Sequence, residues 1–232
     1  VQVEVGPGGT QSRELNIGFF SRMVRGIPWV RMKAAASLDG VTALANGTSQ
    51  WITSPAARAD GHAWRARACA VLTGIGTVLA DDPRLDVRLD PVIEVATGLR
   101  VVLDAGLRSL ARANVRSGPT PTLYLHAPQT AVPAGDWGGA QFAAVPLAAD
   151  GRLDLAAVLA ALAARGINEV HVEAGAQLCG ALVAANLYDE LLLYQAPTLL
   201  GDAARPLLSG LAVPAMAQQR RLQLYEALMV GQ

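Results

Sequence analysis

Short apolar runs alternate with longer segments of helical periodicity along most of the chain. Apolar runs bounded by turn residues are typical of buried β-strands. We expect strands at 30–36, 70–73, 100–104, 122–125, 142–145, 169–173 and 190–194. One last strand is expected between Arg221 and Val230, whereas 105–121 and most of 127–152 are expected to be loops.

Helices are expected in three of the intervening segments, 54–68, 153–165 and 176–185. The first has Pro55 at a favoured first-turn position behind a cap. The second ends at Gly166, a natural helix stop. Strands that alternate with helices predict an α/β fold, with a mostly parallel sheet covered on both faces. In such sheets, ligands bind beyond the carboxyl ends of the strands.

A polar cluster follows the first expected strand. The segment Lys33 to Thr53 (KAAASLDGVTALANGTSQWIT) begins as a core strand and then carries hydrogen-bonding side chains at 37, 39, 42, 46, 48, 49 and 50. A cluster at that place indicates a site at the carboxyl edge of the sheet.

Composition excludes some classes of protein. The chain has 232 residues, is 52% hydrophobic, and has equal numbers (19 each) of basic and acidic residues, so its net charge is zero. A nucleic-acid-binding protein usually has a basic excess, so nucleic acid is not an expected partner. No apolar run approaches the roughly 20 residues that span a membrane. Cys69 and Cys179 are expected to be reduced core residues, which favours a cytoplasmic protein.

The glycine-containing stretch 73–85 (TGIGTVLADDPRL) follows an expected strand. Glycines allow close approach of a ligand to the backbone, and free N–H groups at a helix start favour phosphate. Thr77 can cap the helix or bind a ligand. An ordinary tight turn is the alternative for the whole stretch.

A similar strand exit stands at 172–183 (VEAGAQLCGALV). It is neither G-x-G-x-x-G nor a P-loop, so it supports neither a standard dinucleotide fingerprint nor a nucleotide triphosphatase. A helix start that receives a diphosphate remains open. His171 and Glu173 match the H-x-E of zinc deaminases, but the chain has no C-x-x-C, so no metal is expected. We interpret His171 as a core or edge histidine and expect Glu173, the last residue of its strand, to meet a ligand.

Basic residues recur on one face of the first expected helix. Arg58, His62 and Arg65 stand at i, i+4 and i+7, and Arg88 follows later. Arginine holds phosphate through paired, charge-assisted hydrogen bonds. A solvated helix face is the alternative for Arg58 and His62.

Taken together, these motifs resemble a known family. The segments KAAASLDGVTALANGTSQWITS, R-x-x-x-D-x-H-x-W-R-A, LTGIGTVLADDPRLDVR, VEAGAQLCGAL and LYDELLLYQAPTLLG stand in the order seen in the reductase domain of the bifunctional riboflavin-biosynthesis deaminase/reductase. The resemblance covers roughly residues 15 to 210. It implies a dihydrofolate-reductase-like fold, with a central mostly parallel mixed sheet, helices on both faces, and homodimers.

The resemblance also implies a reaction and a set of site residues. NADPH would reduce the ribose of 5-amino-6-(5-phosphoribosylamino)uracil to the ribitylamino form. Lys33 and Glu173 match positions for substrate polarisation and proton movement. The substrate positions are Ser49, Arg65, Leu85, Arg88 and Glu173. The cofactor positions are Ala35, Trp51, Thr77, Asp81, Gly175, Ala176, Gln177, Leu178, Cys179, Gly180 and Ala181.

Two departures from the family stand at the cofactor positions. Ala174 replaces the first glycine of a pair, which should keep the turn. Ala105 stands where some members have a serine near the adenosine end of the cofactor, which weakens the expected preference for NADPH.

We expect residues 1–27 to be a linker from a missing N-terminal deaminase domain and 28–232 to be the reductase domain. The chain begins at Val1 and shows no signal peptide, so we expect a piece of a longer polypeptide; a stand-alone reductase is the weaker alternative. Other functions remain open at this point. They are a same-fold reductase for another pterin or pyrimidine, a non-catalytic nucleotide-binding module, and a structural interaction protein.

Overall fold

The structure is a computed structural model that describes residues 6–89 and 98–231. Its helices are α1 (Gly9–Leu15), α2 (Ile17–Arg25), α3 (Pro55–Arg67), α4 (Ile75–Asp81), α5 (Leu155–Ala164) and α6 (Ala176–Ala184), with short 3-10 turns at Asn114–Arg116 and Met216–Gln218. Its strands are β1 (Trp29–Ser37), β2 (Val41–Ala43), β3 (Ala70–Gly74), β4 (Leu99–Leu103), β5 (Thr122–His126), β6 (Gln141–Ala144), β7 (Glu169–Glu173), β8 (Glu190–Ala196) and β9 (Arg205–Pro206).

Seven strands form one sheet in the order β6-β5-β4-β3-β7-β1-β8. All neighbouring strands in it are parallel. The expectation of a mixed central sheet is therefore wrong for the described residues: antiparallel pairing occurs outside that sheet, between β2 and β9 and in an isolated bridge between Leu147 and Leu153. The α/β fold is therefore confirmed, and each strand predicted up to residue 194 is found within about two residues of its expected bounds.

The last predicted strand is wrong. Residues 221–230 have no regular structure, and their apolar side chains, such as Leu224 and Met229, lie in solvent. An alternating pattern forms a strand only where a neighbouring strand offers backbone partners. In the described residues β8 is bonded only to β1, so residues 221–230 do not pair with its other edge and gain no backbone partners there.

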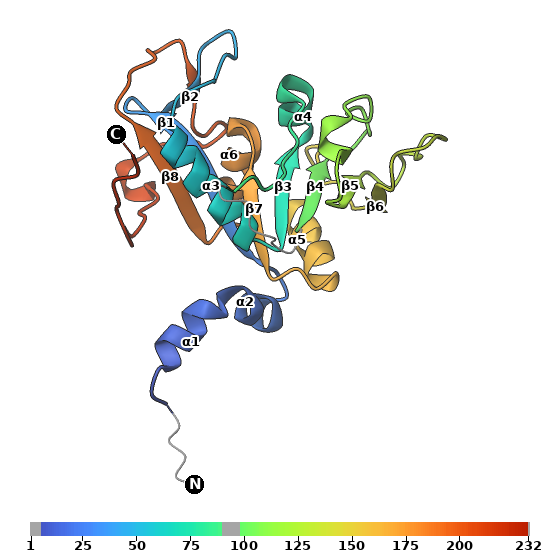
Figure 1. Ribbon diagram of the computed structural model, residues 1–232, viewed down its shortest axis with the longest axis horizontal. Coiled ribbons are helices and arrows are strands. Elements are labelled where there is room, and N and C mark those ends of the chain that lie inside the picture. Colours follow the sequence, from blue (N-terminus) through green and yellow to red (C-terminus); the bar gives the residue numbers. More distant parts are fainter. Residues whose placement is uncertain (1–5, 90–97, 232) are drawn as a thin grey trace.

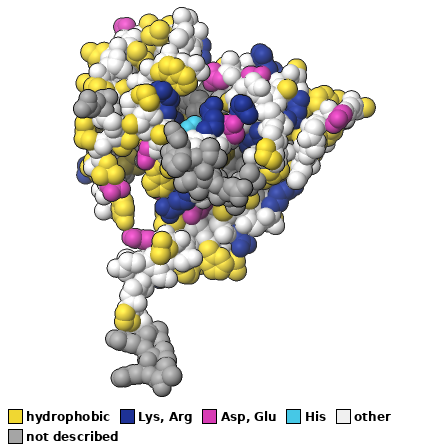
Figure 2. Space-filling view, viewed as in Figure 1, with side chains coloured by type: hydrophobic (Ala, Val, Ile, Leu, Met, Phe, Trp, Pro, Cys, Tyr) yellow, Lys and Arg dark blue, Asp and Glu magenta, His cyan; other side chains and the backbone are white. Residues whose placement is uncertain are grey.

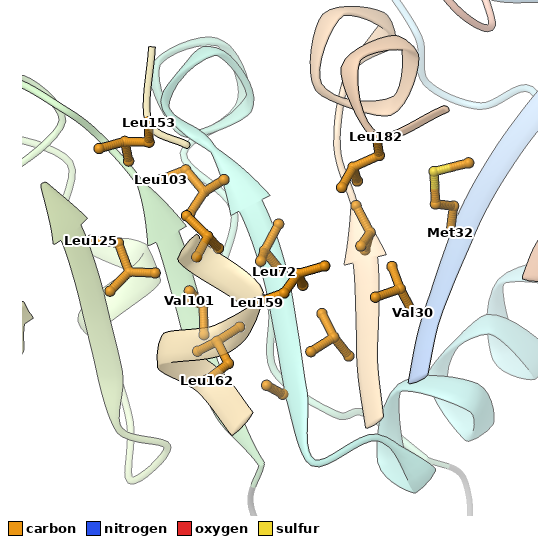
Figure 3. Close-up of a cluster of buried hydrophobic side chains, with 14 of the residues drawn as sticks. Val30, Met32, Leu72, Val101, Leu103, Leu125, Leu153, Leu159, Leu162 and Leu182 are labelled. Atoms are coloured by element: carbon orange, nitrogen blue, oxygen red, sulfur yellow. The ribbon is translucent and has the colours of Figure 1, made fainter. Parts of the chain in front are cut away.

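The sheet has an apolar layer on each face. Figure 3 shows the larger one, in which strand residues meet α5 and α6; its labelled members include Val30, Met32, Leu72, Val101, Leu125, Leu159, Leu162 and Leu182. On the opposite face Val71, Val102 and Tyr124 pack against residues of α4 and the loop after β4. Helix α3 covers the β1 and β7 end of that second face, because Arg65 bonds Glu173 and Arg31 stacks on Trp64.

Local signals explain the helix ends. The Ser54 hydroxyl accepts the Ala57 N–H at 3.2 Å, and Pro55 begins α3 as expected. Asp154 caps α5 by accepting two backbone N–H groups. Gly166 follows that helix at φ +81, a left-handed conformation that glycine adopts without strain.

Helices α1 and α2 lie in the segment that was expected to be a linker. Helix α2 packs below the amino ends of the strands (Figure 1). Arg22 bonds the Asn168 side chain at 2.6 Å, and Arg25 forms an ion pair with Asp189, also at 2.6 Å. The sequence of α2 carries apolar residues at helical spacing, Ile17, Phe20 and Val24, but Phe20 and Val24 are exposed and these bonds to the sheet are polar. The helical pattern was therefore present in the sequence and marks an exposed stripe, not a buried one.

The strand order places a crevice at the carboxyl edge. Strand β7 lies between β1 and β3, although it comes much later in the chain. The carboxyl ends of these three strands, with the starts of α4 and α6, meet at the top of Figure 1. This is the arrangement in which parallel sheets bind ligands. None of the described helices is both long enough and apolar enough to cross a bilayer.

Candidate active site

A cleft of about 1700 Å³ opens at this carboxyl edge. Figure 2 shows basic and acidic side chains gathered around a histidine near the centre of one face. The volume exceeds the roughly 300–1,000 Å³ of a site for one drug-sized ligand. Sixteen of the candidate residues line it: Lys33, Ala35, Ser49, Trp51, Arg65, Thr77, Asp81, Leu85, Arg88, Glu173, Gly175, Ala176, Gln177, Leu178, Cys179 and Ala181.

Gly180 is the candidate that does not line the cleft. It is buried, and a Cβ at this position would lie 1.9 Å from the carbonyl oxygen of Ser209. The loop after β9 therefore packs directly on the α6 backbone. The glycine is required by this close approach.

Gly180→Ala should destabilise the fold by about 1–3 kcal/mol or more, because helix and loop must separate. A denaturant melt of the variant measures this cost. Gly175→Ala is the matched control, because a Cβ there would meet nothing within 4 Å. Equal stability of the two variants would contradict the packing role of Gly180.

Lys33 and Glu173 lie directly opposite one another. They are register partners in the parallel strands β1 and β7, so their side chains leave the same face of the sheet. Glu173 is the last residue of β7, whereas Lys33 lies in the middle of the longer β1, and both line the cleft. Lys33 is the only lysine in the chain, which otherwise uses arginine for its basic residues. This scarcity was a signal in the sequence that points to Lys33.

Arg65 holds Glu173 in a two-pronged ion pair. Its Nε donates to Oε1 of Glu173 at 2.7 Å and its Nη2 to Oε2 at 2.8 Å. Its Nη1 donates to the carbonyl oxygen of Asp86. Burial by itself would raise the pKa of Glu173, but the charge and hydrogen bonds of Arg65 outweigh it and lower the pKa to about 2. Glu173 is therefore an ionised acceptor at neutral pH, and much of the Arg65 guanidinium is already engaged.

His171 lies beneath Glu173. Its side chain is fully buried, with Nε2 at 3.5 Å from Oε1 of Glu173. Burial lowers the pKa of His171 to about 4, so the ring is neutral at pH 7. The interpretation of His171 as a core histidine is confirmed. Across residues 6–89 and 98–231, no three potential metal ligands come together.

A second cluster of charges surrounds Asp86. Its carboxylate lies 3.1 Å from Nε of Arg84 and 3.5 Å from Nε of Arg88. Both arginines line the cleft and remain more than half exposed. Sequence reasoning missed Arg84 and Asp86, although both stand in the family-like segment LTGIGTVLADDPRLDVR. The exposed guanidinium groups at this end of the cleft thus belong to Arg84 and Arg88, each beside Asp86, rather than to the mostly buried Arg65.

His62 and Arg58 hold loops in place and are not simply a solvated face. Nδ1 of His62 accepts the Arg88 N–H at 3.2 Å, and burial lowers the pKa of His62 to about 4. Arg58 donates to the Thr53 carbonyl at 2.7 Å and stacks on the Trp51 ring at 4.3 Å. The two side chains therefore fix the segment from Trp51 to Thr53 and the segment around Arg88.

The two glycine-bearing strand exits leave room for a ligand. A Cβ on Gly76 or Gly175 would meet nothing within 4 Å, and both residues line the cleft. Among the described residues no side chain caps helix α6 at Gly175, so its first N–H groups are open to a ligand. The capping alternative for Thr77 is wrong, because α4 starts at Ile75 behind Gly74 without a side-chain cap.

Other polar or reactive side chains that the sequence singled out serve the fold. The Ser37 hydroxyl bonds the Asp39 carboxylate, which accepts the N–H groups of Leu200 and Gly201 at 3.1 and 2.8 Å. These bonds tie the turn after β1 to the loop after β8. Burial raises the pKa of Cys179 to about 11, so this residue is an unreactive thiol.

The comparison with protein families decides the affiliation. Residues 28–232 match the family of the RibD C-terminal domain. The chain belongs to this family. Its Escherichia coli (strain K12) relative, "Riboflavin biosynthesis protein RibD", is 37% identical over 96% of this chain and 62% of the relative. The chain thus spans less than two thirds of the length of such relatives.

Solved structures of RibD proteins agree with this assignment. Acinetobacter baumannii RibD, form 2, has a TM-score of 0.82 at 34% identity, over 99% of this chain and 62% of that chain. A Thermotoga maritima deaminase/reductase has a TM-score of 0.78 at 23% identity, over 94% of this chain and 58% of that chain, and shows the fold alone. The dihydrofolate-reductase-like fold expected of RibD reductase domains is therefore confirmed.

Proposed function

We propose that this RibD C-terminal domain reduces the ribose of 5-amino-6-(5-phosphoribosylamino)uracil to the ribitylamino product in riboflavin biosynthesis. The name of the Thermotoga maritima neighbour includes a reductase of this compound. The proposal is carried by one observation: the only lysine of the chain and an ionised Glu173 face one another in a cleft of about 1700 Å³, enough for a dinucleotide and a nucleotide together.

The residues of the cleft have distinct parts in this reaction. When bound, NADPH supplies the hydride that is added to C1′ of the opened sugar. Lys33 donates the proton that the attached nitrogen takes up. Glu173 is held ionised by Arg65, so it accepts hydrogen bonds from sugar hydroxyls and does not act as the acid. The Gly175 turn and the free N–H groups of α6 bind the diphosphate.

We propose NADPH rather than NADH, although Ala105 lacks the serine hydroxyl of some family members. Two exposed arginines, Arg108 and Arg152, line the same cleft as Ala105. Arg108 follows β4 and Arg152 precedes Leu153, which Figure 3 shows beside Leu103. Their charges can meet the additional phosphate of NADPH.

The direct test is to mix the protein with NADPH and 5-amino-6-(5-phosphoribosylamino)uracil and to follow the absorbance of the reduced nicotinamide. Oxidation at a rate set by the substrate supports the proposal. A flat trace with NADPH bound would favour a nucleotide-binding module. No NADPH binding by calorimetry would favour a structural protein. Oxidation only with other pterins or pyrimidines would identify a different reductase of the same fold.

Arg88→Ala should raise the KM for the phosphorylated substrate about 10- to 100-fold with little change in kcat. A lost charge-assisted hydrogen bond costs about 1.5–3 kcal/mol, and the Arg88 guanidinium is exposed to the cleft. Steady-state kinetics measure the effect. Arg165→Ala is the control, since this exposed arginine caps the C-terminal end of α5 and does not line the cleft. An unchanged KM in Arg88→Ala would contradict the proposal that Arg88 binds the phosphate of the substrate.

We propose further that two copies pair along β8. This strand has one bonded neighbour among the described residues, and Leu193 and Leu199 are exposed beside its free edge. An open edge with apolar side chains suits self-complementary pairing with a second copy. Sedimentation measures the mass in solution; a monomer at micromolar concentration would overturn this proposal.

Two coarser assignments complete the proposal. The family match begins at residue 28, which supports residues 1–27 as a linker to a deaminase domain and 28–232 as the reductase domain. Both cysteines are free thiols, which supports a cytoplasmic location.

A further inference from the structure

Lys33 occupies a slot between two strands. On one side its register partner is Glu173 in β7. On the other side lies β8, in which Tyr194 is the partner of Ala35, two residues after Lys33 on the same face of the sheet. Lys33 and Glu173 lie opposite one another, yet they form no ion pair within the described residues. The group that the ammonium does contact lies on the β8 side.

Tyr194 is that group. Its ring centroid lies 5.6 Å from Nζ of Lys33, within the range of a cation–π contact. The side chain is 8% exposed, so the ring is fixed by its surroundings. Its hydroxyl donates a hydrogen bond of 2.5 Å to Oδ2 of Asp60 on α3. The ring is thus anchored at its polar end and presents its face to Lys33.

Gly61 keeps the slot open. This residue follows Asp60 in α3, and a Cβ on it would lie 3.8 Å from Cε of Lys33 and 3.9 Å from Oη of Tyr194. A methyl group would only touch both side chains, but a branched side chain would fill the space around the ammonium. The helix therefore carries a glycine in its interior, a residue that weakens helices, at the place where Lys33 and Tyr194 meet.

We propose that Tyr194, held by Asp60, is a positioning residue that directs the ammonium of Lys33 into the cleft and away from Glu173. The catalytic consequence rests on the proposed reductase function. The geometric part does not, because it concerns only contacts within this chain.

The test of the geometry uses the single lysine. Reductive methylation with ¹³C-formaldehyde labels Lys33 and the terminal amine and keeps the charge of both. In the wild type and in Tyr194→Phe the Lys33 methyl signal should be shifted upfield by the ring. In Tyr194→Leu it should return to the position of free dimethyllysine. Tyr188→Leu is the matched control, because Tyr188 packs on the core away from Lys33, and it should not move the signal. The same Lys33 shift in Tyr194→Leu and in the wild type would overturn the inference.

Kinetics then test the consequence. Tyr194→Leu should lower kcat about tenfold with an unchanged KM for NADPH, whereas Tyr194→Phe should stay within about twofold of the wild type, because a ring face is retained. Equal losses in both variants would assign the effect to the hydroxyl and Asp60 and overturn the ring role. If the wild type itself does not oxidise NADPH, the reductase proposal fails while the methyl signals still decide the geometry.

Discussion

Lys33→Met is expected to lower kcat at least a hundredfold, with the KM for NADPH nearly unchanged. Proton transfer by a positioned side chain contributes about 10²–10⁴ to a rate, and Lys33 is the only lysine available. Methionine keeps the apolar stem that packs beside Gly61 and Tyr194 but removes the ammonium. Initial-rate measurements at saturating substrate and cofactor give the change in kcat.

Lys33→Arg is the informative control. Arginine keeps the positive charge but does not release a proton near neutral pH. If Lys33 is the acid, this variant should be nearly as slow as Lys33→Met. Near-wild-type activity of Lys33→Arg would show that charge alone is needed, and near-wild-type activity of Lys33→Met would remove Lys33 from the mechanism.

Arg65→Met should be the most destabilising single change in the site, by about 3–5 kcal/mol. Removing one partner of a buried ion pair leaves the other charge without compensation. Arg65 and Glu173 are both mostly buried, with side-chain exposures of 11% and 16%. The loss should also lower kcat, because Glu173 loses the two bonds that orient it. Arg88→Ala removes an exposed guanidinium and should leave stability unchanged.

A double-mutant cycle separates the two partners. Glu173→Gln in the Arg65→Met background should restore part of the lost stability, because the stranded charge is removed. Urea unfolding of the four proteins measures the coupling. Additive effects of the two substitutions would contradict a direct ion pair between Arg65 and Glu173.

The same pair predicts an acid dependence. The folded pKa of Glu173 is lowered from 4.5 to about 2, so its contribution to stability is complete above pH 4.5 and is lost as the pH falls toward 2. The stability advantage of the wild type over Glu173→Gln should therefore shrink across that window. A constant difference between pH 6 and pH 2 would show that the pKa of Glu173 is not lowered.

Much of the fold was predictable because its signals are local. Ser54 and Pro55 mark the start of α3, and Gly166 marks the end of α5. The helix at 17–25 was missed although Ile17, Phe20 and Val24 stand at helical spacing; that apolar stripe is largely exposed, and Arg22 and Arg25 hold the helix to its neighbours. The strand expected at 221–230 did not form, because this segment pairs with none of the described strands. Its local pattern alone could not show whether a strand of the sheet would accept it.

The site was predictable as a set of residues but not as an arrangement. Family-like motifs bring sixteen cleft residues to attention. Nothing local in the sequence shows that Arg65 is engaged by Glu173, 108 positions away, or that Asp86 holds Arg84. The sequence-based assignment of Arg65 to a phosphate did not anticipate that most of its donors are already used.

The sequence by itself determined the alternation of strands and helices, the glycine turns and a single lysine within a core strand, because periodicity and end signals act between near neighbours. Only the tertiary structure decided that β7 enters between β1 and β3. That insertion sets Glu173 opposite Lys33. Helix α3 then places Arg65 against Glu173 and Gly61 beside Lys33. Charges and contacts depend on distances through space, and those are decided only when the whole sheet is assembled.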